Sequence, residues 1–167
     1  MIRRDFRFEV LRTHPILLYD GVCGLCNHLV QFILRHDRND VFRFASLQSS
    51  LATSMLTRHG AASRDLDTVY VVPRRQLAAK SAINTYQASE SLLSRSEAVI
   101  FALKELGGIW RLAGFLLQMF PRFLRNWAYD QVARNRYRIF GRFETCPVPT
   151  ASTRGKFLDI EEETVGK

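Results

Sequence analysis

Two cysteines, Cys23 and Cys26, stand between an apolar run and a stretch with helical periodicity, and this placement restricts the fold more than any other feature of the chain. The apolar run Ile16–Tyr19 predicts a buried strand, and the stretch Gly24–His36 repeats apolar residues on one helical face. The CxxC pair is therefore predicted at the N-terminus of the first helix. Unpaired backbone N–H groups and the positive end of the helix dipole favour the thiolate form of a cysteine in that position.

The rest of the chain predicts further strands and helices in a regular alternation. β-Branched, aromatic or alternating patterns favour strands at Val41–Ala45 and at Thr68–Val72. The stretch Gln76–Ser91 is ambiguous, and a strand around Ser91–Ser94 would complete a hairpin with the strand Thr68–Val72. Helices are expected from an N-cap at Ser46 to Gly60, from a capping box at Ser94–Glu97 to Gly107, over the apolar segment Ile109–Phe120, and after Pro121. The order βαβαββα with additional C-terminal helices is that of a thioredoxin-like α/β fold. The first βαβ unit should have parallel strands and a right-handed connection.

Composition indicates one ordinary domain. The chain has 167 residues, of which 47% are hydrophobic, and it has no uninterrupted apolar run long enough for a transmembrane helix. Residues 1–14 are expected to be a lead-in, residues 15–149 the domain with its helical extension, and residues 150–167 a disordered tail. The N-terminus has early positive charge without a following apolar region, so a cytoplasmic location is expected, where cysteines are usually reduced, catalytic or metal-bound.

Several separated blocks of the sequence resemble the DCC family, which is named for an Asp-x-x-Cys-x-x-Cys motif. The motif is present as Asp20 to Cys26, and similar blocks follow at residues 42–49, 96–98, 106–110 and 133–142. The resemblance implies a thioredoxin-like fold and a thiol-disulfide oxidoreductase with a dithiol site. Thioredoxins also have a cis-proline before the third strand, whereas this chain has Asp65-Leu66-Asp67-Thr68 there. Substrate binding of the thioredoxin kind is therefore in question.

Each residue of the motif has an expected role and a simpler alternative. Cys23, nearer the helix start, is the candidate nucleophile, and Cys26 is the candidate resolving thiol. Asp20 could accept the proton of Cys26, or it could be a turn residue that bonds local N–H groups. The partner would be a disulfide-containing protein or small molecule, and an unidentified donor would supply electrons. Disulfide exchange itself needs no external cofactor.

The principal alternative is a non-catalytic binding module. Its CxxC would be inert or would hold a metal together with Cys146 and a histidine. A zinc site of this kind normally has a second closely spaced pair of ligands, and none follows in the sequence. An incidental role is therefore favoured for Cys146. Its basic C-terminal helices would dock a protein or a membrane surface.

Two C-terminal segments have sequence features of binding surfaces. Segment Gly107–Phe120 could lie on a membrane surface, but apolar residues nearly all round it favour burial in the core. The block Arg134–Arg142 interleaves arginines with aromatic residues, which superficially suits nucleic acid. A segment anchored to its own fold with solvated arginines is expected instead. The net charge of +8 does not by itself locate a binding site.

Overall fold

A four-stranded mixed sheet forms the centre of the protein in a computed structural model that describes residues 13–58, 60, 68–74, 92–143, 150 and 152–159. The strand order is β2 (Arg43–Ser46), β1 (Ile16–Tyr19), β3 (Tyr70–Val72) and β4 (Leu93–Ser94). Strands β1 and β2 are parallel, while β3 is antiparallel to both β1 and β4. The predicted parallel βαβ unit and the following hairpin are confirmed, and the fold is thioredoxin-like.

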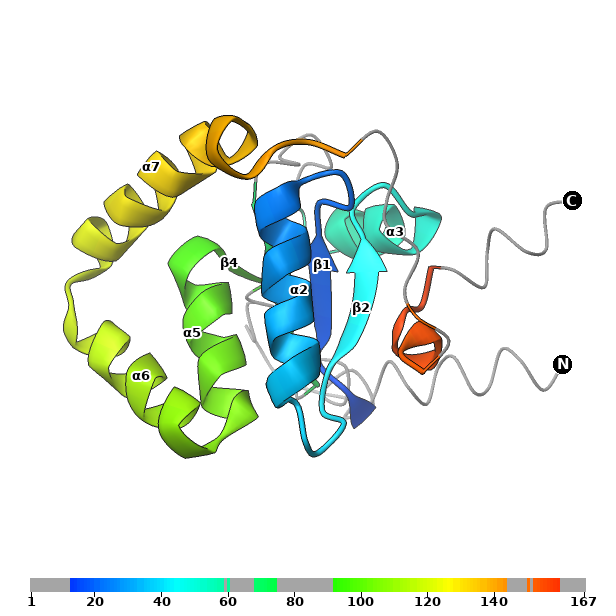
Figure 1. Ribbon diagram of the computed structural model, residues 1–167, viewed down its shortest axis with the longest axis horizontal. Coiled ribbons are helices and arrows are strands. Elements are labelled where there is room, and N and C mark those ends of the chain that lie inside the picture. Colours follow the sequence, from blue (N-terminus) through cyan, green and yellow to red (C-terminus); the bar gives the residue numbers. More distant parts are fainter. Residues whose placement is uncertain are drawn as a thin grey trace, which may run out of the picture.

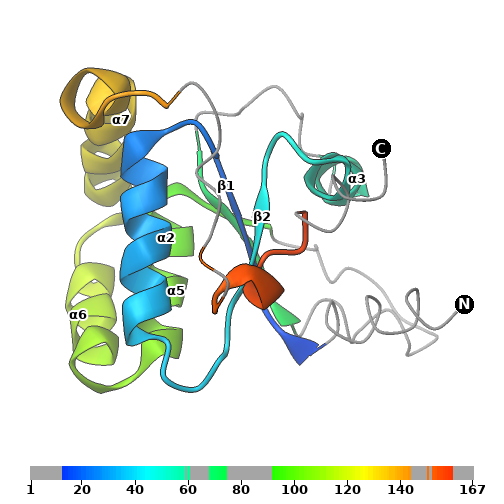
Figure 2. The ribbon, with the colours of Figure 1, turned by 45° about the vertical axis from the view of Figure 1, so that its right-hand side comes forward.

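Helices cover both faces of this sheet. The described helices are α2 (Gly24–His36), α3 (Ser50–Arg58), α5 (Arg95–Leu106), α6 (Gly108–Met119) and α7 (Arg122–Phe140). Helices α2 and α5 lie on one face, with α6 and α7 outside them, and α3 lies on the other face (Figures 1 and 2). Alternate residues of the strands point into two apolar clusters, one beneath α2 and α5 and one beneath α3.

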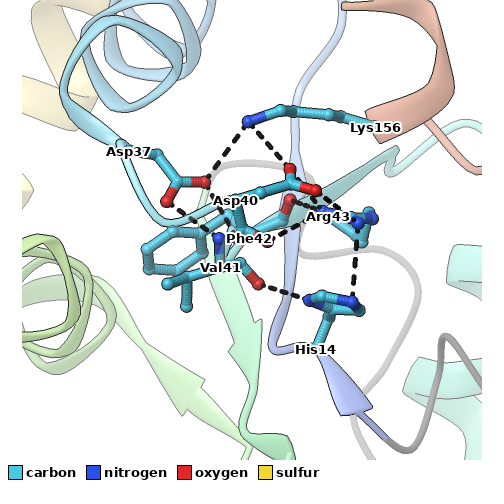
Figure 3. Close-up of polar contacts among 7 residues, drawn as sticks. All are labelled: His14, Asp37, Asp40, Val41, Phe42, Arg43 and Lys156. Atoms are coloured by element: carbon cyan, nitrogen blue, oxygen red, sulfur yellow. Dashed lines mark hydrogen bonds and ion pairs between the residues drawn. The ribbon is translucent and has the colours of Figure 1, made fainter.

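Local hydrogen bonds move two element boundaries from their predicted positions. Strand β2 begins at Arg43 because the Asp37 carboxylate accepts the N–H groups of Val41 (2.8 Å) and Phe42 (3.0 Å), as Figure 3 shows. The predicted N-cap at Ser46 was wrong because Ser46 is the last residue of β2. The hydroxyl of Ser49 accepts the N–H of Ala52 instead, and α3 begins at Ser50.

The predicted capping box lies at the start of α5, but its side chains do not make the expected hydrogen bonds. Ser94 is the N-cap of α5, yet its side chain makes no capping hydrogen bond. The Glu97 carboxylate forms an ion pair with Arg122 of α7 instead. A residue predicted to close the start of α5 therefore links it to a helix later in the chain.

Residues 152–159 depart from the expected disordered tail. Phe157 is 5% exposed and stacks on Phe44 with ring centroids 5.3 Å apart, and the N–H of Leu158 donates to the Phe44 carbonyl. Lys156 of the short 3-10 helix Arg154–Lys156 lies 3.0 Å from the Asp40 carboxylate (Figure 3). The aromatic packing of Phe157 acts together with these polar contacts to attach an otherwise polar segment to the sheet.

The apolar segment that forms α6 is not buried in the core, contrary to expectation. Gly114 lies against α5, where a Cβ atom would be 3.3 Å from the Ile100 carbonyl oxygen, and Trp110 packs edge-on against Phe32 of α2. No described element covers the opposite side, where Met119 is 82% exposed. None of the described helices combines the length and hydropathy needed to span a bilayer.

Candidate active site

The two cysteines of the motif lie together at the start of α2, as their spacing predicts. Cys23 is the N-cap residue, with extended backbone angles, and Cys26 lies in the first turn. Both are free cysteines, with exposed fractions of 0% and 4%. The two thiols lie close enough that each is the largest influence on the pKa of the other.

The hydrogen bond between the thiols separates their pKa values. Donation from Cys26 is the largest cause that lowers the pKa of Cys23 to about 6; burial opposes it, and the positive charge of Arg136 contributes to the lowering. The same hydrogen bond, together with burial and the charge of the Cys23 thiolate, raises the pKa of Cys26. Cys23 is therefore the thiolate of the pair near neutral pH, and Cys26 keeps its proton.

The Asp20 carboxylate, 1% exposed, is surrounded by donors. One oxygen accepts the Val22 N–H (3.2 Å) and the Gln48 amide (2.8 Å), and the other accepts the Tyr137 hydroxyl (2.6 Å) and Arg136 (3.2 Å). The bond to Val22 is that of a turn residue, as one of the two sequence interpretations expected. The remaining bonds join the motif loop to the connection between β2 and α3, through Gln48, and to α7.

Arg136 and Tyr137 were not assigned to the site from the sequence. Arg136 is 2% exposed, although the arginines of this block were expected to be solvated, and its guanidinium lies over the Tyr137 ring at 4.5 Å. Burial and the hydrogen bond to Asp20 raise the pKa of Tyr137 to about 12. The only signal in the sequence was that block 133–142 accompanied the cysteine motif in the family resemblance, which indicated a shared site but no individual role.

The end of α7 covers the dithiol. The Gly24 N–H donates to the Gly141 carbonyl (3.2 Å), the Phe143 N–H donates to the Val22 carbonyl (2.8 Å), and Cys23 and Arg142 form an isolated β-bridge. Figure 1 shows this end of α7 above the start of α2. Gly24 allows the approach, because a Cβ atom there would lie 2.9 Å from the Phe140 carbonyl carbon and closer still to its oxygen.

A polar cleft of about 720 Å³ adjoins the network around Asp20. It lies between the sheet edge and α7, and its lining includes Thr68, Ser94, Asn126, Arg134 and Tyr137. Thr68 ends the segment that replaces the cis-proline of thioredoxins, but residues 65–67 lie outside the described part of the chain.

A metal site at the CxxC would need further ligands. Within the described ranges, no three histidine, cysteine or acidic side chains lie close enough together to hold a metal ion. Cys146, the third cysteine, lies outside the described residues, so its expected incidental role stays a prediction.

Alkylation of Cys23 should follow the lowered pKa. Thiolate is the reactive form, so the rate should rise with pH around a midpoint of about 6 and level off above it, whereas a free cysteine has its midpoint near about 8.5. Replacing Cys26 with alanine removes the donor to the Cys23 sulfur, so the midpoint should move to higher pH. Iodoacetamide labelling between pH 4 and 9, followed by peptide mass analysis, measures both curves. Identical midpoints would show that Cys26 does not stabilise the thiolate.

Comparison with known proteins agrees with the motif. The family model of the DCC1-like thiol-disulfide oxidoreductases matches residues 17–142. A chloroplastic DCC family protein of Arabidopsis thaliana is 38% identical over 132 residues, which cover 79% of this chain and 68% of that protein. The uncharacterized protein YuxK of Bacillus subtilis is 34% identical over 143 residues, 86% of this chain and 93% of that protein. No solved structure matches.

Proposed function

Because the chain belongs to the DCC1-like thiol-disulfide oxidoreductase family, we propose that Cys23 and Cys26 are its redox couple and exchange electrons with the disulfide of a protein or small-molecule partner. The observation that carries this proposal is the placement of two free cysteines at the start of α2, with Cys23 at the N-cap and Cys26 in the first turn. It pairs one thiolate with one protonated thiol, which is the arrangement that disulfide exchange requires.

In the reducing direction, the Cys23 thiolate attacks one sulfur of the partner disulfide. A mixed disulfide forms and the partner's other sulfur leaves as a thiolate. Cys26 then loses its proton and attacks the Cys23 sulfur, which forms the Cys23–Cys26 disulfide and releases the second partner thiol. Two electrons have passed to the partner, and a dithiol donor must restore the reduced pair.

The first step lowers the pKa of Cys26 and thereby favours the second step. The pKa of Cys26 is raised chiefly by its hydrogen bond to Cys23, by burial and by the Cys23 negative charge. Once Cys23 is in a mixed disulfide, that charge is absent, so Cys26 releases its proton more readily. We assign Asp20 as the proton acceptor, with Arg136 holding the carboxylate at the site through their 3.2 Å ion pair.

Access of a partner requires the cover over Cys23 to open. The described contacts between this cover and the motif loop include two backbone hydrogen bonds, from Gly24 and from Phe143. Local opening of a short connecting segment of this kind needs less free energy than global unfolding. The proposal therefore includes displacement of residues 141–143 before the first step.

Turnover of a disulfide substrate tests the proposal. With dithiothreitol as donor and insulin as substrate, Cys23→Ser should reduce disulfides no faster than dithiothreitol alone, because serine cannot form the mixed disulfide. Cys26→Ser should accumulate a mixed disulfide at Cys23, which mass spectrometry detects. Cys146→Ser is the matched control and should keep the wild-type rate. Full turnover by Cys23→Ser would show that Cys23 is not the nucleophile. A wild-type rate no faster than that of dithiothreitol alone, or stoichiometric zinc retained through gel filtration, would favour the binding-module alternative.

A further inference from the structure

The outer side of α6 and α7 carries exposed large apolar side chains that no described element covers. Met119, Phe123 and Ile109 have exposed fractions of 82%, 75% and 74%. We call the following set the α6–α7 face: Ile109, Leu112, Leu116, Met119, Phe120, Phe123 and Trp127. Contiguous apolar surface of this extent on a single chain usually marks an interaction site.

The geometry of α6 turns its apolar residues outward. Gly114 contacts α5, and the residues spaced at i, i+3, i+7 and i+10 from Ile109 lie on the opposite side of the helix. An apolar groove of about 340 Å³ between α5, α6 and α7 continues this surface inward, and its lining includes Phe120 and Leu124. The α6–α7 face is therefore an amphipathic surface presented to solvent.

The turn between α6 and α7 is the most prominent part of this face. Met119, Phe120 and Phe123 flank Pro121 and Arg122 there, and the turn lies at the left-hand edge of the molecule, away from the sheet (Figure 1). Apolar side chains at a projecting turn can enter a surface without any rearrangement of the fold.

Positive charge surrounds the face. Between Gly108 and Phe143 the sequence has seven arginines and one acidic residue, Asp130. Six of these arginines have exposed or partly exposed side chains, and the seventh, Arg136, is buried and pairs with Asp20. On α7, Phe123, Trp127, Arg134 and Arg138 follow one another at intervals of four, seven and four residues, so they share one side of the helix.

We propose that the α6–α7 face docks onto an anionic lipid bilayer, with the turn inserted among the headgroups and the arginines paired with lipid phosphates. Aromatic and aliphatic residues beside arginines are the pattern of helices that lie in a membrane interface. A second copy of the chain fits the face less well, because its own α6 and α7 offer a single acidic residue, Asp130, to pair with the arginines. The docking uses neither thiol, so it stands or falls independently of the proposed redox couple.

Vesicle binding tests the proposal on the full chain. Sedimentation with vesicles of phosphatidylcholine and phosphatidylglycerol should carry the protein down, and pure phosphatidylcholine should bind it much more weakly. Replacing Met119 and Phe123 with aspartate should abolish binding. The charge-matched control Thr53→Asp with Ser54→Asp alters exposed residues of α3, on the opposite face of the sheet, and should bind like wild type.

Variants of the arginines provide a second test in the same vesicle experiment. Arg134→Gln with Arg138→Gln should weaken binding by about 30-fold, since each cation near an anionic membrane surface raises the affinity by about 5-fold. Arg35→Gln with Arg38→Gln removes the same charge at exposed positions at and beyond the end of α2 and should cost far less. Trp127, 60% exposed, should show a blue-shifted emission on anionic vesicles that Trp127→Phe removes.

Three results would overturn the proposal. The first is no binding to anionic vesicles at millimolar lipid, and the second is equal binding by the aspartate double variant of Met119 and Phe123. The third is a wild-type dimer in analytical ultracentrifugation that the same variant converts to monomer, because a second copy would then cover the face.

Discussion

Replacing Asp20 with alanine is expected to lower the free energy of unfolding by about 3 to 5 kcal/mol, which is the cost of leaving one partner of a buried ion pair uncompensated. Asp20 and Arg136 are 1% and 2% exposed, and the carboxylate also accepts hydrogen bonds from Gln48 and Tyr137. All these donors would lose their acceptor at once. Urea denaturation followed by circular dichroism measures the change, and the midpoint should fall markedly.

Asp40→Ala is the matched control for this variant. The Asp40 carboxylate pairs with Arg43 at 2.9 Å and with Lys156 at 3.0 Å, but its side chain is 58% exposed, so the loss of these pairs should cost less than about 1 kcal/mol. Alanine at the left-handed backbone of Asp40, where φ is 53°, should add about 1 kcal/mol, and the total stays below the cost of Asp20→Ala.

Replacing the pair together, with Asp20→Leu and Arg136→Met, should recover part of the loss, because no buried charge remains, while the Gln48 amide and the Tyr137 hydroxyl still lack this acceptor. If Asp20→Ala costs no more than Asp40→Ala, the buried network does not stabilise the fold.

The elements around the cysteines could be predicted because their signals are local. The apolar run of β1 and the periodicity of α2 gave the observed bounds Ile16–Tyr19 and Gly24–His36, and the spacing of Cys23 and Cys26 placed both sulfurs at the helix start. The β-branched residues of β3 likewise predicted that strand, whereas β4, with two residues and no β-branched side chain, was expected only as its hairpin partner.

The remaining parts of the site depend on contacts between residues far apart in the chain. Arg136 and Tyr137 reach Asp20 across more than one hundred positions, and no periodicity marks them as different from Arg134 or Arg138. The same limit applies to α6, where an apolar composition predicted burial. Only the tertiary arrangement shows that α5 occupies one side of this helix and that no described element occupies the other.

Replacing Gly24 with alanine is expected to expose Cys23 by displacing the end of α7. The new methyl group would overlap the Phe140 carbonyl and lie 3.1 Å from the Gly141 carbonyl oxygen, and both atoms belong to backbone that must shift. Overpacking of this kind costs about 1 to 3 kcal/mol in the closed state. If opening relieves that cost, the open population rises about tenfold to a hundredfold.

The rate of Cys23 alkylation at pH 8 measures that open population, because the cysteine is 0% exposed when the cover is closed and its pKa of about 6 keeps it as thiolate. Gly155→Ala is the matched control, since a Cβ atom at Gly155 would meet nothing within 4 Å, and it should leave the rate unchanged. Faster alkylation in Gly24→Ala alone would show that residues 141–143 gate the dithiol. An unchanged rate in both variants would mean that reagents reach Cys23 by another path, and that the end of α7 is a structural support rather than a cover that must open.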